Sequence, residues 1–192
     1  MSDSKETLTA AYGEVLKVLQ DDLGWDRRED VENMDGSAER AAKALLDMIH
    51  NRPDVEAKVA DILRKRFPAR SNTSVRQTGL TTSFLCPHHL LPVVCDISVS
   101  YLVTQEHGAI GLSKVQRIAT LLGKGPVLQE DYTADLASAL ALVGGKAVAR
   151  TTAIHTCMAC RGILAPNIRT ECEAERKADL NQIERSKNGT EG

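Results

Sequence analysis

The sequence predicts an α+β fold, in which N-terminal helices precede an antiparallel sheet that carries helices on one face. Apolar residues recur at helical spacing in the first third of the chain. Apolar and polar residues then alternate between Cys95 and Tyr101, as they do in a strand with one buried face. Two later segments, which begin near Ser113 and Thr133 and end at glycines, have the signals of short helices.

Three helices are expected in the N-terminal third. The first has five large side chains at helical spacing: Leu8, Tyr12, Val15, Leu16 and Leu19. It would end at Gly24. The second begins at Ser37, a residue type that often caps a helix N-terminus. The third begins near Pro53, because proline is tolerated in the first turn, where its missing N–H is not needed.

The clearest strand covers residues 93–103. Its expected buried face consists of Val93, Cys95, Ile97, Val99, Tyr101 and Val103, and its polar face contains Asp96, Ser98 and Ser100. The following "EHG" is expected to be the turn of a hairpin that returns through "AIGL". Three further elements are expected. A helix begins at Ser113, and a second helix covers residues 133–143 and is closed by Gly144 and Gly145. A strand then follows through "KAVARTTAIHTCM".

These elements divide the chain into three parts. Residues 1–70 form a helical region, residues 71–170 form the sheet domain that carries the candidate site, and residues 171–192 form a charged C-terminal tail that is expected to fray. We found no internal repeats and no low-complexity linkers.

Composition excludes several functional classes. The formal net charge is −2, which gives no overall field for nucleic acid or for an anionic membrane. Aromatic residues make up 3 %, too few for a platform that stacks bases. No apolar run is long enough to cross a bilayer, and "MSDSKETL" does not resemble a signal peptide. We therefore expect a cytoplasmic protein that binds neither nucleic acid nor membranes.

Thiols and imidazoles gather in two short segments about seventy residues apart, "CPHH" with Cys86, His88 and His89, and "HTCMAC" with His155, Cys157 and Cys160. The first could hold zinc, pair a nucleophile with its base, or form only a polar turn. Two such groups at strand ends favour a shared zinc site, since catalytic zinc takes three protein ligands of these types and one water. If the strand continues, His155 and Cys157 lie on the same face.

The remaining cysteines indicate less. The chain has five cysteines, an odd number, and a disulfide framework is not expected. The Cys157-x-x-Cys160 spacing could indicate redox chemistry, but the βαβ pattern typical of such motifs is missing. Cys95 is expected in the core. The sequence around Cys172 does not indicate a function for this residue.

A basic group accompanies these residues. Ser113, Lys114 and Arg117 lie at the start of one expected helix, a favourable place for phosphate, although solvated charge is the usual role of any one such residue. Arg161 follows Cys157 closely enough for the basic and metal groups to meet. Gln129 and Glu130 could read the edge of guanine, although a solvated loop is the default.

Together these segments resemble the GTP cyclohydrolase I family. The matching stretches are "CPHHLLP", "IGLSKVQRI", "GPVLQEDYT" and "AIHTCMACRG", in the order and at close to the spacing of that family, with a fainter match at "SAERAAKAL". The resemblance covers roughly residues 36–162. It implies a tunnelling fold, with a four-stranded antiparallel sheet and two helices on one side. It also implies a homo-oligomer, expected to be a decamer with sites at subunit interfaces.

The resemblance also implies residue roles. The zinc ligands would be Cys86, His89 and Cys157, while His88, His155 and Ser113 would take part in catalysis, His88 and His155 as acid or base and Ser113 at the ribose. Lys114, Arg117, Arg161 and a neighbouring subunit's Arg40 would hold the triphosphate, and Gln129 and Glu130 the guanine. The implied reaction is hydrolytic opening of the imidazole ring of GTP, which releases formate and gives 7,8-dihydroneopterin triphosphate for folate, biopterin or deazapurine routes.

The chain departs from the family at three places near the expected site. Pro87 stands where the family usually has Glu, and Asp131 where it usually has Arg. We hypothesise that these two changes compensate each other, and additive effects in a double-mutant cycle would refute this. Cys160 replaces a residue that is more often apolar, and the shortened end puts the last strand in doubt. The alternatives are an enzyme for another purine nucleotide, one that stops at the formamide, or a non-catalytic nucleotide-binding ring protein.

Overall fold

The computed structural model describes residues 2–188, which form two compact units with a boundary between Ile49 and His50. The N-terminal unit contains only helices: α1 (Ser2–Lys17), a π-helical turn η1 (Val18–Asp22), α2 (Arg28–Met34) and α3 (Ser37–Met48). Helices α1 and α3 pack against each other, and an exposed ion pair of 3.1 Å joins Lys5 to Glu39. No helix among residues 2–188 is long and apolar enough to cross a membrane.

The second unit is built on a four-stranded antiparallel sheet with strands in the order β1-β2-β3-β4. The strands are β1 (Thr73–Leu85), β2 (Pro92–Val103), β3 (Lys146–His155) and β4 (Thr170–Lys177). Each strand pairs with its neighbour in sequence, so every connection joins adjacent strands. The expected inner face of β2 is confirmed, because its six alternate residues from Val93 to Val103 are all at most 4 % exposed.

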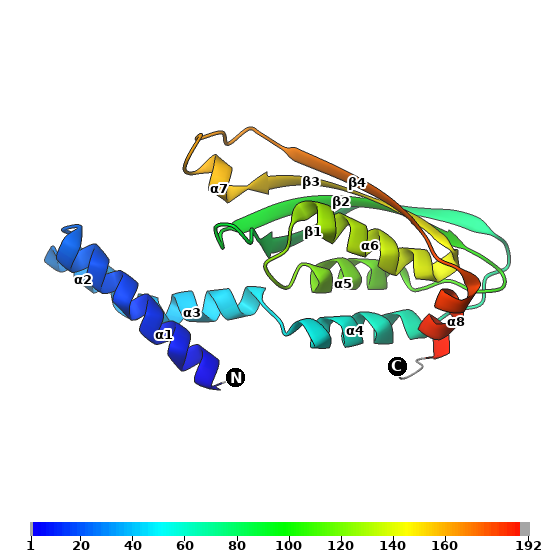
Figure 1. The fold of residues 1–192 in the computed structure, drawn as a ribbon, viewed down its shortest axis with the longest axis horizontal. Coiled ribbons are helices and arrows are strands. Elements are labelled where there is room, and N and C mark those ends of the chain that lie inside the picture. The colour runs from blue at the N-terminus through cyan, green and yellow to red at the C-terminus, as the bar shows by residue number, and fades with distance from the viewer. Residues whose placement is uncertain (1, 189–192) are drawn as a thin grey trace. The chain divides into compact units, whose positions relative to one another are not determined.

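Helices cover one face of this sheet (Figure 1). The polar side chains of β2 alternate with its buried residues and so lie on the other face. Helices α5 (Leu112–Leu122) and α6 (Gln129–Gly144) lie against the strands, and α4 (Arg52–Arg64) packs on α5. The close approach of α6 to β2 requires glycine at position 144, because a Cβ atom there would lie 2.4 Å from the carbonyl oxygen of Leu102. The predicted α+β class, with helices on one face, is confirmed.

Residues 171–188 differ from the expectation of a frayed tail, and the rest of that tail, residues 189–192, lies outside the described residues. Residues after Glu171 continue β4, and helix α8 (Leu180–Asn188) follows. Alternate residues of β4 turn toward α6, and Ile183 of α8 is buried. Arg66 fixes α8 further, because its guanidinium donates to Ser186 and to the carbonyl oxygens of Leu142 and Val143. The doubted last strand is therefore present, although its sequence reads as a charged segment.

Two other boundaries differ. Helix α6 begins at Gln129, one turn before the expected start, so that Gln129 and Glu130 lie in its first turn rather than in a loop. The expected hairpin through "AIGL" is reduced to a bridge between Thr104 and Gly108, and Ala109 pairs instead with Phe67. The second difference arises because Phe67 satisfies the backbone N–H and carbonyl groups of Ala109.

Candidate active site

The connection between β1 and β2 is a tight turn that presents two histidines beside a buried cysteine. The backbone N–H of Leu90 donates to the carbonyl oxygen of Cys86 at 2.8 Å, and the N–H of Cys86 donates to Leu91 at 2.9 Å. Leu90 adopts a positive φ of 52°, which reverses the chain within a few residues. The turn brings Nδ1 of His88 and Nδ1 of His89 to 3.9 and 3.8 Å from the Cys86 sulfur.

The third candidate ligand, Cys157, comes from a helical turn, and the expected strand geometry is wrong at this point. Strand β3 ends at His155, and residues Thr156–Ala159 form the short helix α7. The hydroxyl of Thr156 donates to the carbonyl oxygen of Pro92 at 2.6 Å and so fixes α7 to the start of β2. The argument that His155 and Cys157 share a strand face therefore does not hold, because Cys157 is placed by helical geometry.

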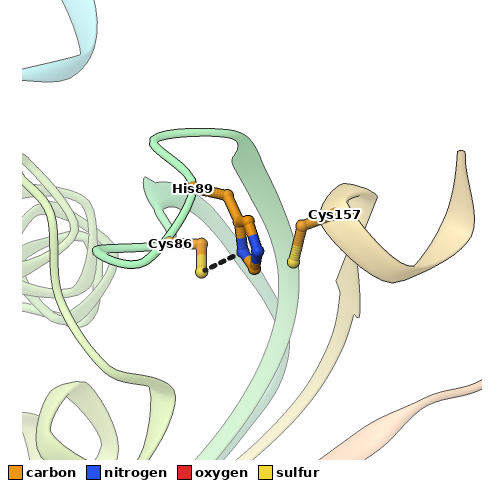
Figure 2. Close-up of side chains that lie close together, drawn as sticks. All are labelled: Cys86, His89 and Cys157. Atoms are coloured by element: carbon orange, nitrogen blue, oxygen red, sulfur yellow. Dashed lines mark hydrogen bonds between the residues drawn. The ribbon is translucent and has the colours of Figure 1, made fainter. Parts of the chain in front are cut away.

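Cys157 of α7 and Cys160, which follows this helix, differ in their surroundings. Cys157 is buried, whereas Cys160 is exposed and its thiol donates to the carbonyl oxygen of Thr156. Ligand atoms of Cys86, His89 and Cys157 all lie within 4.8 Å of one another. Figure 2 shows the His89 ring between the two thiols, with Cys157 projecting from α7 toward the turn that carries Cys86.

This donor set fits zinc. Two thiolates and one imidazole are ligands that zinc prefers, and three protein ligands leave a fourth position for water. Burial, followed by the neighbouring Cys86 thiol, raises the pKa of Cys157, and Arg161 opposes this increase. Two adjacent thiols cannot both ionise cheaply without a cation between them, so the arrangement is suited to a metal ion. Arg161 acts on Cys157 electrostatically, as expected from their spacing.

His155 lies beside the first turn of α6. Its Nε2 is 3.1 Å from Oε1 of Gln129. Burial lowers the pKa of His155, whereas the nearby Glu130 carboxylate raises it. Glu130 is exposed, whereas Gln129 is only 3 % exposed. The end of β3, the start of α6 and the β1–β2 turn therefore meet at one end of the sheet.

The predicted phosphate group lies elsewhere in the chain. Ser113, Lys114 and Arg117 are on the first turns of α5, which begins next to Gln77 in the middle of β1, where the Gln77 side chain donates to the Leu112 carbonyl. The metal ligands lie beyond Leu85, at the end of the same strand. Eight residues of strand put the start of α5 about 25 Å from the end of β1, whereas Gln116, next to Arg117, bonds to Thr81 and lies nearer to that end. The structure does not bring these two groups together within one chain.

The ammonium of Lys114 forms hydrogen bonds within its own chain. Its ammonium donates to the carbonyl oxygens of Ile62 and Lys65, at 2.7 and 3.0 Å, at the C-terminal end of α4. Burial is the main cause that lowers the pKa of Lys114, and the cations of Lys65 and Arg117 add to it. A small hollow of about 380 Å³ next to this cluster is lined by Asp61, Ile62, Arg64, Lys65, Lys114 and Arg117.

The N-terminal unit carries the last predicted residue. The guanidinium of Arg40 donates to the carbonyl oxygen of Asp35 and to the hydroxyl of Ser37, at 2.8 and 2.9 Å. Sequence reasoning overlooked two residues, Thr151 and Thr170, whose side chains bond to Gln129. Thr170 opens a segment that reads as a charged tail, and no local pattern indicates its role.

The fold and the site define a class: an α+β protein with a Cys-His-Cys group, two buried thiols and one exposed imidazole, that could bind a metal ion. A family model described as GTP cyclohydrolase I matches residues 9–188. The chain belongs to the GTP cyclohydrolase I family.

Individual relatives agree with this assignment. The GTP cyclohydrolase 1 of Corynebacterium glutamicum (strain R) is 31 % identical over 174 residues, which cover 90 % of this chain and 84 % of the relative. The enzyme of the same name from Alkalilimnicola ehrlichii is 33 % identical over 165 residues, 84 % of this chain and 83 % of the relative. That from Teredinibacter turnerae is 34 % identical over 137 residues, 70 % of this chain and 72 % of the relative.

Proposed function

We propose that this protein opens the imidazole ring of GTP by hydrolysis, releases formate and forms 7,8-dihydroneopterin triphosphate. The observation that carries the proposal is the Cys86, His89 and Cys157 group, whose ligand atoms lie within 4.8 Å of one another in a chain of the GTP cyclohydrolase I family. These three residues come from two segments far apart in the sequence. Cys86 and Cys157 are free thiols, so no disulfide joins the two segments.

Zinc is the metal that this donor set would hold. When bound there, zinc supplies a water activated for attack at neutral pH. The chain's own residues do the rest: Cys86 and Cys157 supply negative charge, and His89 completes the set through an exposed ring on the turn. His88 and His155 are the other two imidazoles at this end of the sheet: Nδ1 of His88 lies 3.9 Å from the Cys86 sulfur, and His155 ends β3 just before α7. In our proposal they exchange protons with a purine held beside the group.

Nucleotide recognition would use two groups of residues. Glu130 is exposed at the start of α6, and its carboxylate can accept hydrogen bonds from the N–H and amino groups of guanine. Arg161, near Cys157, suits the phosphates or the ribose. Ser113, Lys114 and Arg117 are separate from these residues along the sheet, and we propose that they act on a nucleotide bound mainly by another subunit.

A composite site of this kind requires a homo-oligomer. In our proposal, the metal ligands and Glu130 of one subunit face the start of α5 of a second subunit, and Arg40 of a neighbouring subunit adds a cation. A ring that closes into a decamer, as the family resemblance implies, would repeat this interface in every subunit. We also propose that the protein is located in the cytoplasm.

The proposal is tested with purified, zinc-loaded protein and GTP. Formate is quantified enzymatically, and the pterin is followed by the fluorescence of its oxidised form. Equal amounts of both products support the proposal. Formate without pterin, or activity only with another purine nucleotide, would indicate a divergent enzyme. Tight GTP binding with full zinc content and neither product would indicate a non-catalytic nucleotide-binding protein. A His155→Asn variant with unchanged zinc content is the control for activity from contaminants.

A further inference from the structure

Gln129 is buried, and each polar atom of its side chain is bonded within the chain. Its Nε2 lies 3.0 Å from the carbonyl oxygen of Thr170, and 3.4 and 3.1 Å from the carbonyl oxygen and the hydroxyl of Thr151. Its Oε1 accepts from the Thr170 hydroxyl at 2.5 Å and lies 3.1 Å from Nε2 of His155. Because backbone carbonyl oxygens can only accept, the amide nitrogen must face them and Oε1 must face His155.

This orientation decides which nitrogen of His155 carries hydrogen. Oε1 of Gln129 has lone pairs only, so a hydrogen bond to His155 needs a hydrogen on Nε2. The lone pair of the neutral ring is then on Nδ1. The same hydrogen bond fixes the orientation of the ring, since Nε2 must point at Gln129.

A closed chain of hydrogen bonds holds Gln129 in this orientation. Its Nε2 donates to the Thr151 hydroxyl, which lies 2.8 Å from the Thr133 hydroxyl, and Thr133 donates to the carbonyl oxygen of Gln129 at 2.7 Å. Because the carbonyl oxygen of Gln129 can only accept, the Thr133 hydroxyl must donate to it, and the Thr151 hydroxyl must therefore donate to Thr133. Gln129, Thr133 and Thr151 are all buried, so these hydrogen bonds are shielded from competition by water.

We propose that Gln129 and Thr170 are positioning residues, which hold His155 in one ring orientation as the Nε2–H tautomer, with the lone pair on Nδ1. Gln129 would then act through His155 and would not touch guanine, which leaves Glu130 as the carboxylate that recognises the base. This inference rests on the proposed function for its kinetic consequences. The tautomer itself is a property of the resting protein.

Thr170 offers a matched pair of variants. Thr170→Val keeps the shape but removes the hydroxyl that donates to Oε1 of Gln129, whereas Thr170→Ser keeps the hydroxyl and loses only a methyl group. We expect Thr170→Val to lower kcat by about tenfold to a hundredfold, a part of the roughly 10²- to 10⁴-fold effect of a positioned acid or base. KM for GTP and zinc content should stay the same, and Thr170→Ser should restore most of kcat.

A second variant separates positioning from base recognition. Gln129→Met has a similar volume but no polar atoms, so we expect a fall in kcat larger than any rise in KM. A rise in KM with kcat retained would show that Gln129 binds guanine, and would overturn the inference. Equal kcat in Thr170→Val and the parent would overturn the role of Thr170.

The tautomer can be observed without turnover. Solid-state ¹⁵N spectra of zinc-loaded protein with labelled histidine distinguish protonated from unprotonated ring nitrogens, and a His155→Asn sample assigns the signals. We expect Nε2 protonated and Nδ1 unprotonated in the neutral ring, with mixed tautomers in Gln129→Met. An Nδ1–H ring in the parent would refute the inference. A protein that shows the expected tautomer but makes neither formate nor pterin from GTP would refute the proposed function alone.

Discussion

The ammonium of Lys114 lies 2.7 Å from the carbonyl oxygen of Ile62, at the end of α4. A second hydrogen bond joins it to the carbonyl oxygen of Lys65. The last carbonyls of a helix have no partners within the helix and carry its negative dipole end, so a lysine placed there stabilises α4. A residue that the family resemblance assigns to phosphate thus also links α4 to α5.

Replacement of Lys114 should therefore affect both stability and catalysis. We expect Lys114→Met to lower the free energy of unfolding by about 1 kcal/mol, the usual net value of such hydrogen bonds, and to raise KM for GTP. The control is Arg117→Met on the same helix, which should raise KM with little change in stability. Urea unfolding and steady-state kinetics measure the two effects. Unchanged stability in Lys114→Met would contradict the structural role.

Zinc content should depend on Cys157 and not on Cys160. Cys157→Ala should remove stoichiometric zinc, because only two ligands remain, whereas Cys160→Ala should keep it, because Cys160 is exposed and bonded to its own helix. Zinc per subunit is measured by mass spectrometry of metals after dialysis. Full zinc content in Cys157→Ala would show that another residue is the third ligand.

Mixed oligomers test the composite site. Cys157→Ala removes the metal group and Arg117→Met removes a phosphate cation, so each variant alone should have little activity. If the two groups of one site come from different subunits, random mixing of equal amounts should restore about a quarter of the sites. Activity is measured after co-expression of both variants with different tags. No recovery in an oligomer proved to be mixed would mean that the two groups act in the same chain.

Stability at alkaline pH should depend on Cys95. This residue is fully buried, and burial is the main cause that raises the pKa of its thiol to about 12. The unfolded chain releases this proton at the ordinary pKa near 8.5, whereas the folded chain keeps it. This contribution to stability is therefore present below pH 8.5 and is lost as the pH rises toward 12.

The loss can reach about 1.4 kcal/mol per pH unit for one such group. We expect Cys95→Ala to be less stable at pH 7, because of the cavity it leaves, but to lose stability less steeply between pH 8.5 and 11. Chemical unfolding at several pH values measures both slopes. Equal slopes would show that Cys95 does not contribute, and that other buried groups such as Tyr132 account for the alkaline loss.

The sequence predicts those features that depend on local pattern. The inner face of β2 follows from alternation, and the ends of α5 and α6 follow from glycines. The position of β4 does not, because Glu171, Glu173 and Glu175 read as a solvated segment until Thr170, Cys172 and Ala174 are seen to turn toward the helices. Such a strand is stabilised by pairing with β3, which no local window contains.

The candidate site shows the same limit. The Cys86, His89 and Cys157 set follows from the motifs and the family resemblance, and the structure brings these atoms together. The helical turn that carries Cys157 was not predicted, because residues 156–159 read as a continuing strand. The network around Gln129 was also missed, since Thr151 and Thr170 are common residue types whose role appears only once β3 and β4 are placed beside α6.

The strand order β1-β2-β3-β4 also determines which sheet edges a subunit exposes before it assembles. In the part of the chain that the structure describes, β1 and β4 each have one neighbouring strand, and the other edge of β1 pairs only at Leu85, with Pro126. A newly made subunit would therefore expose two rows of backbone donors and acceptors, which can template a correct neighbour or an aggregate. The glutamates and lysine of β4 discourage indiscriminate pairing on one edge, whereas β1 has a single charge, Arg76. Dilute or underexpressed subunits should be the ones that need chaperones.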